Sequence, residues 1–239
     1  MCILLVLKDR VEGWPLVLGA NRDEFRDRPF APPRAEGAVL APRDLRAGGT
    51  WLALDRSGFV VAVTNLPEPA PDPARESRGL LALALARAGG VEAAEALARA
   101  ELAKGRRNAF QVLLADAWRA RVLAHPGAGG APFDATDLPP GLHTMTNRHR
   151  PGELDPGREL DPLTRPGAAD LEAVLERLRA VLSSHGPRPE DAFCKHGRDR
   201  GTLSSALVAI PAPASSDRPR FLFAPGAPCE SAFTSVIPG

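Results

Sequence analysis

Short apolar runs, separated by turn residues, dominate the first third of the chain. The runs at 2–7 and 16–20 flank Lys8–Pro15, which contains Gly and Pro, so the pair predicts a β-hairpin. Thr50–Leu54 and Phe59–Thr64 flank another Gly-containing turn and predict a second hairpin. The N-terminal third is therefore expected to form antiparallel strands.

Helical periodicity appears in three later segments. A helix is predicted over Leu80–Ala88 after an N-cap at Ser77, and a second over Val91–Lys104. A third, amphipathic helix is predicted over Leu171–Ser184, with Asp170 as its N-cap.

The remaining apolar runs predict further strands, interrupted by irregular segments. The strands are expected at Ala109–Ala115, Ala117–Ala124, Leu142–Thr146, Ser204–Ile210 and Arg220–Ala224. Proline- or glycine-rich stretches at 66–74, 126–140 and 148–169 predict loops. Strands with helices in separate blocks indicate an α+β fold, with antiparallel sheets and helices packed outside them, in a single domain spanning residues 1–239.

Composition narrows the function classes. The 44% apolar fraction is ample for a core, and the net charge of +1 gives no electrostatic case for nucleic acid or a membrane surface. The apolar runs are too short for a transmembrane segment, and the first run lacks the features of a signal peptide. Three scattered cysteines give no disulfide framework, so a cytoplasmic protein is expected. The sequence indicates no oligomeric state.

The metal and phosphate motifs are weak. Gly127–Gly130 is followed by no lysine or helix start, so it does not predict a phosphate loop. Cys194 and His196 could face one side of a strand, but no CxxC or HExxH completes a zinc site. The other histidines are scattered and are expected at the surface: His125, His143, His149 and His185. No metal and no required cofactor are predicted.

Cys2 stands at the start of the first apolar run, and in the predicted hairpin it lies near the polar cluster Asn21–Glu24. If Met1 is removed, the residue carries both a thiol and a free α-amine with a pKa of about 7.7–8, which can take the thiol proton. Alternatively, Cys2 is a small apolar residue of a buried strand.

Asn65 and Asn147 end two strands with the same dipeptide, Thr-Asn. An amide N–H at a strand tip can stabilise an oxyanion and is worth about 2.7–4 kcal/mol of barrier when well placed. Asparagine also simply terminates strands, which is the alternative interpretation.

Several of these segments together resemble one family. They are Met1-Cys-Ile, Ala20–Phe25, Gly48–Leu52, Thr64-Asn65, Ser77–Gly79, Asn108, Phe110–Leu114, Thr146-Asn147 and Gly201–Ser205. The set is similar to the NRDE family, also called the transport and Golgi organisation protein family, through nearly the whole chain. That family is similar to the N-terminal-nucleophile hydrolases of the penicillin V acylase and bile salt hydrolase branch. The resemblance implies a four-layer αββα sandwich.

The resemblance also implies roles for individual residues. Cys2 would be the nucleophile and, through its amine, the base, while Asp23 would orient it. Asn65 and Asn147 would hold the oxyanion, so all four residues are expected to line one pocket.

Three further residues are expected to contact substrate. Asn21 and Arg22 stand beside Asp23, and Arg200 precedes the late family block. Leu203 stands where that block usually has arginine. Arg200 or Arg198 is the candidate replacement for that missing charge.

Two functions from different classes follow. The first is a cysteine N-terminal-nucleophile amidohydrolase or acyltransferase that acts on an amide or thioester bond of a small acylated substrate. The second is a non-enzymatic carrier of haem or a similar hydrophobic metabolite, because eukaryotic members are linked to secretory organisation, lipid handling and haem trafficking. No CxxCH motif supports haem attachment, and Cys229 follows a proline instead of preceding one. The residues favour the hydrolase.

Overall fold

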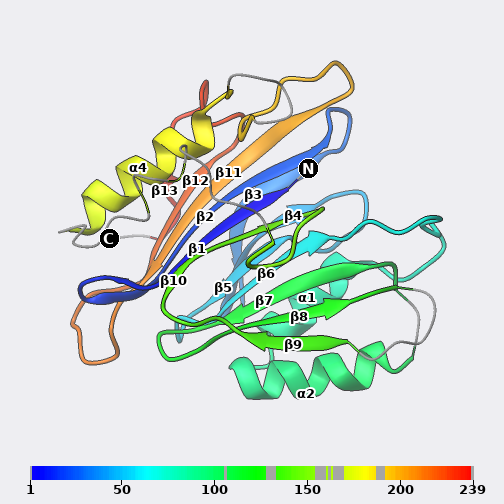
Figure 1. The fold of residues 1–239 in the computed structure, drawn as a ribbon, viewed down its shortest axis with the longest axis horizontal. Helices are drawn as coiled ribbons and strands as arrows, with labels where there is room; N and C mark the ends of the chain where they lie inside the picture. Colours follow the sequence, from blue (N-terminus) through cyan, green and yellow to red (C-terminus); the bar gives the residue numbers. More distant parts are fainter. Residues whose placement is uncertain are drawn as a thin grey trace. The chain divides into compact units, whose positions relative to one another are not determined.

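The computed structural model describes residues 2–104, 107–127, 133–153, 160, 163, 170–186 and 192–237. Much of the predicted loop 148–169 and the centre of the predicted loop 126–140 lie outside these residues. The chain divides into two compact units (Figure 1). The first unit comprises Met1–Asp27, Pro139–Met145 and Pro151–Gly239, and the second comprises Arg28–Leu138 and Thr146–Arg150.

The first unit contains a six-stranded sheet with the strand order β10-β1-β2-β11-β12-β13. The strands are β1 (Ile3–Val11), β2 (Trp14–Phe25), β10 (Gly141–Thr146), β11 (Arg200–Ile210), β12 (Arg220–Ala224) and β13 (Thr234–Ser235). β1 and β2 form the predicted N-terminal hairpin, and β2 also pairs antiparallel with β11. The N-terminal hairpin therefore occupies the middle of this sheet.

Helix α4 (Leu171–Ser183) covers this sheet at β2 and β11, as the yellow helix in Figure 1 shows. Its predicted N-cap is confirmed, because the Asp170 side chain accepts a hydrogen bond from Ala173 N at 2.7 Å. A Cβ atom at Gly19 of β2 would lie 3.0 Å from Leu178 and 3.1 Å from Leu182. The missing side chain at Gly19 thus lets the buried leucines of α4 pack directly on the strand.

The second unit contains a seven-stranded sheet with the order β3-β4-β5-β6-β7-β8-β9. The strands are β3 (Phe30–Glu36), β4 (Val39–Asp44), β5 (Leu52–Asp55), β6 (Val60–Asn65), β7 (Phe110–Ala115), β8 (Ala120–His125) and β9 (Asp134–Asp137). Helices α1 (Arg78–Ala86) and α2 (Val91–Leu102) pack on β5 to β8. The apolar residues of these helices and of the sheet form one buried core.

Gly49 and Gly79, which both belong to the segments that resemble the family, allow two backbone segments of the second unit to approach closely. Thr50 N donates to Gly79 O at 3.0 Å, which joins the segment before β5 to the first turn of α1. A Cβ atom at Gly49 would lie 2.2 Å from the carbonyl carbon of Gly79. The predicted N-cap at Ser77 is confirmed by its bond from Leu80 N. These motif positions therefore shape the fold.

Four strands were not predicted: β3, β4, β9 and β13. β3 contains Pro32 and Pro33, and prolines argue against a strand in a sequence. The structure tolerates them because β3 is an edge strand with an irregular register. β9 lies within residues 126–140, which were predicted to form a loop. All four of its side chains are exposed, so the strand has no buried apolar face that the sequence could reveal. β3, β9 and β13 are edge strands, which need little apolar alternation, so the pattern does not reveal them.

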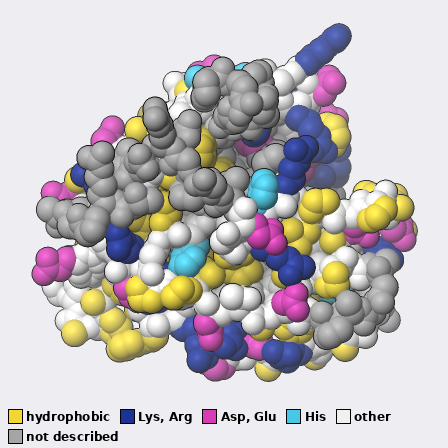
Figure 2. All heavy atoms as spheres, viewed as in Figure 1, with side chains coloured by type: hydrophobic (Ala, Val, Ile, Leu, Met, Phe, Trp, Pro, Cys, Tyr) yellow, Lys and Arg dark blue, Asp and Glu magenta, His cyan; other side chains and the backbone are white. Residues whose placement is uncertain are grey.

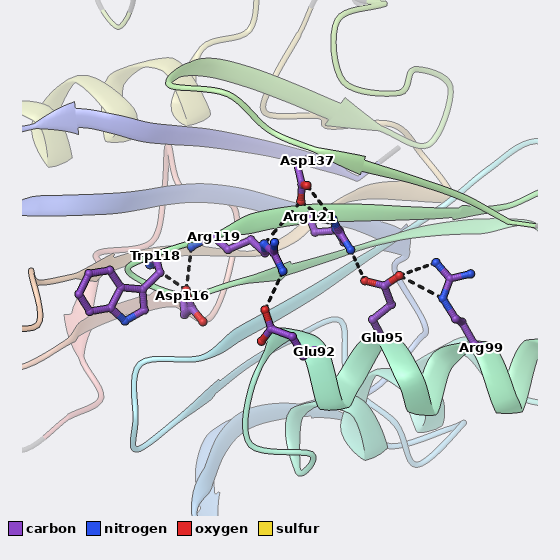
Figure 3. A network of polar contacts seen from close by, with 8 residues as sticks. All are labelled: Glu92, Glu95, Arg99, Asp116, Trp118, Arg119, Arg121 and Asp137. Carbon is purple, nitrogen blue, oxygen red and sulfur yellow. Dashed lines mark hydrogen bonds and ion pairs between the residues drawn. The ribbon is translucent and has the colours of Figure 1, made fainter.

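An ion-pair network attaches β9 to its neighbours (Figure 3). Arg121 on β8 forms a bidentate pair with Asp137 of β9 and also bonds Glu95 of α2. The two carboxylates raise the pKa of Arg121. Arg119 extends the network to Glu92 at 2.6 Å. A network of this kind stabilises more than isolated surface pairs do, and it explains an exposed strand without an apolar pattern.

Charged side chains of both signs are interspersed on the face drawn in Figure 2. This distribution agrees with the formal net charge of +1. Among the described residues, none of the helices has the length and apolar character needed to span a membrane.

Candidate functional site

Cys2 lies at the end of the β1–β2 hairpin in the first unit, directly before β1. Ile3 pairs with Asn21, so Cys2 is next to the stretch of β2 that carries Arg22 and Asp23. The Cys2 thiol donates a long hydrogen bond to the backbone oxygen of Asp23, with Sγ and O 3.7 Å apart. The thiol is partly buried, and Asp23 is 6% exposed.

A side chain of β11 donates a hydrogen bond to the Asp23 carboxylate. Thr202 Oγ1 donates to Asp23 Oδ1 at 2.7 Å and accepts a hydrogen bond from Lys195 N at 2.9 Å. The pairing of β2 with β11 shifts register between Thr202 and Ser204, so Leu203 forms a bulge. Thr202 pairs directly with Asp23 beside this bulge. Thr202 was not predicted as a site residue.

Burial controls the electrostatics of this pair. Desolvation raises the pKa of the Cys2 thiol, and the nearby Asp23 carboxylate raises it further. Desolvation also raises the pKa of Asp23, although the hydrogen bond from Thr202 opposes the shift. Both effects disfavour the thiolate, so a nucleophilic attack by Cys2 needs a base that removes the thiol proton.

Asp23→Asn is expected to make the protein more stable than wild type at neutral pH. The folded-state pKa of Asp23 is raised above its unfolded value of about 3.9, so the folded state binds the proton more strongly. The carboxylate therefore destabilises the fold as pH rises through the folded-state pKa, and asparagine, whose Oδ1 still accepts from Thr202, removes this cost.

Urea unfolding at about pH 3.5, below the unfolded pKa, and at about pH 8 measures the effect. The stability advantage of the variant should grow with pH. Asp217→Asn is the matched control, because it removes an exposed carboxylate of the same unit. An advantage for Asp23→Asn that is constant with pH would contradict the assignment.

The three predicted substrate contacts lie in different environments. Asn21 is 2% exposed, and its Nδ2 donates to Leu182 O and Phe193 O, both at 2.9 Å. Only its amide oxygen has no hydrogen-bond partner among the described residues. Arg22 is 4% exposed. The contact of each with a substrate stays a prediction, and the amide nitrogen of Asn21 already serves to hold the loop at Phe193.

Arg200 is exposed at the start of β11. Its guanidinium carbon lies 3.7 Å from the centre of the Phe25 ring, and its Nη2 is 3.9 Å from Glu24 Oε1. Stacking on Phe25 holds the arginine at this end of the sheet. Its role as a replacement for the family arginine at Leu203 stays a prediction.

The two predicted asparagines both belong to the second unit. Asn65 is exposed at the end of β6, and the half-buried Asn147 follows β10. Gln111 of β7 contacts the residue that precedes each asparagine. Its backbone pairs with Thr64, and its Nε2 donates to Thr146 O at 2.7 Å and to His149 O at 2.9 Å. The two Thr-Asn endings are thus linked through one residue, by its backbone pairing with Thr64 and by its side-chain bonds to Thr146 and His149.

Gln111 was missed in the sequence. It is fully buried in a strand that is otherwise apolar, and this isolated amide in the run Phe110–Leu114 was the available signal. Buried amides are retained when they satisfy backbone groups, and Gln111 does so for the Thr146–His149 turn.

A cluster of four sulfur and imidazole groups was also missed. His185, Cys194, His196 and Cys229 place their potential ligand atoms within 4.8 Å of one another in the first unit. The sequence analysis predicted no zinc site for Cys194 and His196 and a surface location for His185. The Cys-x-His spacing was a signal, but its partners are distant in sequence.

Comparison with known proteins identifies the family. The family described as "Transport and Golgi organisation 2" matches residues 1–206. A Homo sapiens "Transport and Golgi organization protein 2 homolog" is 30% identical over 159 residues, which cover 62% of this chain and 57% of the human protein. A Bos taurus protein of the same description is 28% identical over 234 residues, covering 89% of this chain and 84% of the bovine one. The chain thus spans just over half of the human relative.

A solved structure with the same fold is a Caenorhabditis elegans ortholog of N-acylethanolamine-hydrolyzing acid amidase. It aligns with a TM-score of 0.58 at 12% identity and covers 91% of this chain and 96% of that chain. At this identity the likeness establishes the fold alone. The predicted α+β class of the N-terminal-nucleophile hydrolase type is confirmed. By its match over residues 1–206, the chain belongs to the transport and Golgi organisation 2 family.

Proposed function

We propose that this protein is a cysteine N-terminal-nucleophile hydrolase that cleaves an amide or thioester bond of a small acylated substrate. The observation that carries the proposal is the position of Cys2. Its thiol lies at the end of the β1–β2 hairpin, 3.7 Å from the backbone oxygen of Asp23. The Asp23 carboxylate is in turn fixed by Thr202 at 2.7 Å.

In the proposed reaction, removal of Met1 makes the α-amine of Cys2 the base. The amine takes the thiol proton as Sγ attacks the substrate carbonyl carbon, and a tetrahedral intermediate forms. The carbon–nitrogen or carbon–sulfur bond then breaks, and the protonated amine returns the proton to the leaving group. Water hydrolyses the resulting Cys2 thioester, which releases the acid and regenerates the thiol.

The raised pKa of the Cys2 thiol supports this use of an amine base. A thiolate that was already formed at neutral pH would need no base, whereas a protonated thiol does. A free α-amine has an ordinary pKa of about 7.7–8.0 and accepts protons near neutral pH. Asp23, which is beside Cys2, is the proposed positioning residue for that amine.

The role of Asn65 and Asn147 as amide donors to the oxyanion stays a prediction, because both belong to the second unit and Cys2 belongs to the first. The fixed backbone around Thr146, held by Gln111, supports a rigid position for Asn147. A preorganised donor stabilises developing charge better than a mobile one.

A hydrolysis screen of the purified, full-length protein tests the proposed function. The panel contains N-acylethanolamines, because the structural relative is named for hydrolysing them, together with N-acyl amino acids and acyl thioesters of graded chain length. Turnover of at least one class is expected, and preincubation with iodoacetamide should abolish it in step with alkylation of Cys2. No turnover across the panel, or full turnover after complete alkylation of Cys2, would contradict the proposal.

A further inference from the structure

Four potential metal ligands converge in the first unit from three separate segments. His185 follows the C-terminal end of α4, Cys194 and His196 precede β11, and Cys229 follows β12. Their ligand atoms all lie within 4.8 Å of one another. Cys229 lies beyond residue 206, where the family match ends, so the family resemblance does not point to this cluster.

The spacing of these atoms fits a small tetrahedral ion. Cys194 Sγ is 3.4 Å from Cys229 Sγ and 3.5 Å from His196 Nε2, and Cys229 Sγ is 3.1 Å from His196 Nε2. Zinc bonds of about 2.3 Å to sulfur and about 2.0–2.1 Å to nitrogen place tetrahedral ligand atoms about 3.3–3.8 Å apart. The three measured separations lie close to this range before any ion draws the ligands into place.

The orientation of His196 suits metal binding. Its Nε2 faces the two sulfurs, and its Nδ1 lies 3.9 Å from Glu230 Oε1. In zinc sites, the histidine nitrogen that does not bind the metal typically donates its proton to a carboxylate or carbonyl. Glu230 lies within ion-pair distance of Nδ1 but beyond hydrogen-bond distance, so metal binding would have to draw it closer to act as that partner. The ring of His185 lies beside that of His196, with centroids 5.2 Å apart.

The cluster is only partly buried, so an ion can reach it from solvent. Cys194 is 1% exposed, whereas His185, His196 and Cys229 are exposed. One anchored thiol with three accessible ligands allows an ion to enter from solvent and be enclosed on one side. Two thiolates would also neutralise the two charges of a divalent ion.

We propose that His185, Cys194, His196 and Cys229 bind one zinc ion as a structural site. All four tetrahedral positions are supplied by the protein, which distinguishes structural from catalytic zinc, where one position stays open. Sulfur and imidazole donors in equal number favour zinc over the oxygen-preferring magnesium and calcium. The ion would tie the end of α4, the loop before β11 and the turn after β12 together.

The proposed ion would also support the site at Cys2, a consequence that rests on the proposed function. The loop that carries Cys194 and His196 also contains Phe193, whose backbone oxygen accepts a hydrogen bond from Asn21 Nδ2. It also bonds Thr202 on both sides, because Lys195 N donates to Thr202 Oγ1 and Lys195 O accepts from Thr202 N, both at 2.9 Å. Thr202 also donates to the Asp23 carboxylate, so two hydrogen bonds in series connect Lys195 N of this loop to that carboxylate.

A Cys194–Cys229 disulfide is the competing fate of the cluster. The two sulfurs are 3.4 Å apart and both cysteines are free, whereas a disulfide needs about 2.05 Å. A disulfide would consume both thiolates and remove the zinc site, so the two alternatives exclude each other experimentally.

Metal analysis of the full-length protein, purified without chelators or an affinity tag that binds metals, tests the proposal. Close to one zinc ion per chain is expected, and titration of metal-free protein with Co²⁺ should give the visible bands of tetrahedral cobalt with thiolate charge transfer. Cys229→Ser and His185→Asn change exposed residues and should each weaken zinc binding by about tenfold or more, since even outer partners contribute that much. Glu230→Gln should weaken it by about tenfold.

Cys2→Ser is the matched control, because it removes a thiol outside the cluster and should leave zinc content unchanged. Circular dichroism confirms that each variant is folded before its metal content is compared. Zinc removal should lower the Tm of wild type more than that of Cys229→Ser. Substoichiometric zinc that Cys229→Ser does not alter, or a Cys194–Cys229 disulfide in freshly purified protein, would overturn the proposal. Because these readouts need no activity, they remain decisive if the hydrolase proposal fails.

Discussion

Cys2→Ala is expected to lower kcat/KM for the best substrate of the acyl panel by about 10³-fold or more, because it removes the nucleophile on which the covalent step depends. The thiol donates to the backbone oxygen of Asp23, and the Thr202 hydroxyl is already engaged as a donor to the Asp23 side chain. The loss should appear in kcat, because the thiol forms its bond to the substrate in the chemical step.

Two further variants separate chemistry from folding. Cys2→Ser keeps a nucleophilic atom and the α-amine, so it should retain more activity than Cys2→Ala. Asp217→Asn changes an exposed residue of the same unit and should leave activity unchanged. Steady-state kinetics of the three proteins, with Tm values alongside, make the comparison. Equal activity of Cys2→Ala and wild type would exclude Cys2 as nucleophile.

Gly49→Ala is expected to destabilise the second unit by about 3 kcal/mol or more, at the upper end of overpacking costs. The added Cβ would lie 2.2 Å from Gly79 C and 2.5 Å from Leu80 N. Both are backbone atoms at the start of α1, so no side-chain rotation can relieve the clash. Either the bond from Thr50 N to Gly79 O breaks or α1 moves off the sheet.

Gly37→Ala is the control in the same unit. Gly37 has a φ of +64°, and nothing lies within 4 Å of its added Cβ, so the cost is only the left-handed conformation, about 1–2 kcal/mol. Urea unfolding followed by fluorescence of Trp51, which packs edge-on against Phe30, reports on this region. A Gly49→Ala variant as stable as Gly37→Ala would contradict the close contact.

Local patterns were sufficient to predict the elements whose apolar residues repeat regularly. The hairpin that contains Cys2 and the helix capped by Asp170 follow from alternation, helical periodicity and capping residues within a few positions. The register of that hairpin also places Cys2 beside the polar end of β2. Local patterning therefore accounts for the part of the candidate site that two adjacent strands provide.

Local patterns could not predict the contacts between segments that are distant in the sequence. Strand β9 is held by the pairing of Asp137 with Arg121, and exposed charges in a glycine-rich stretch have the appearance of a loop. Thr202 reaches Asp23 across 179 positions, and Cys194 meets Cys229 across 35. These pairings depend on sheet order, which single-segment propensities do not encode.

The most direct test of the central claim is to trap and map the acyl-enzyme. Wild-type protein is quenched in acid during turnover of a slow thioester or amide substrate, digested and analysed by mass spectrometry. The hydrolase account predicts an N-terminal peptide that begins at Cys2, without Met1, and carries the acyl group as a thioester on Sγ that neutral hydroxylamine removes. Cys2→Ala should carry none. Turnover by a chain that retains Met1, or an acyl group found on another residue in both proteins, would contradict the account.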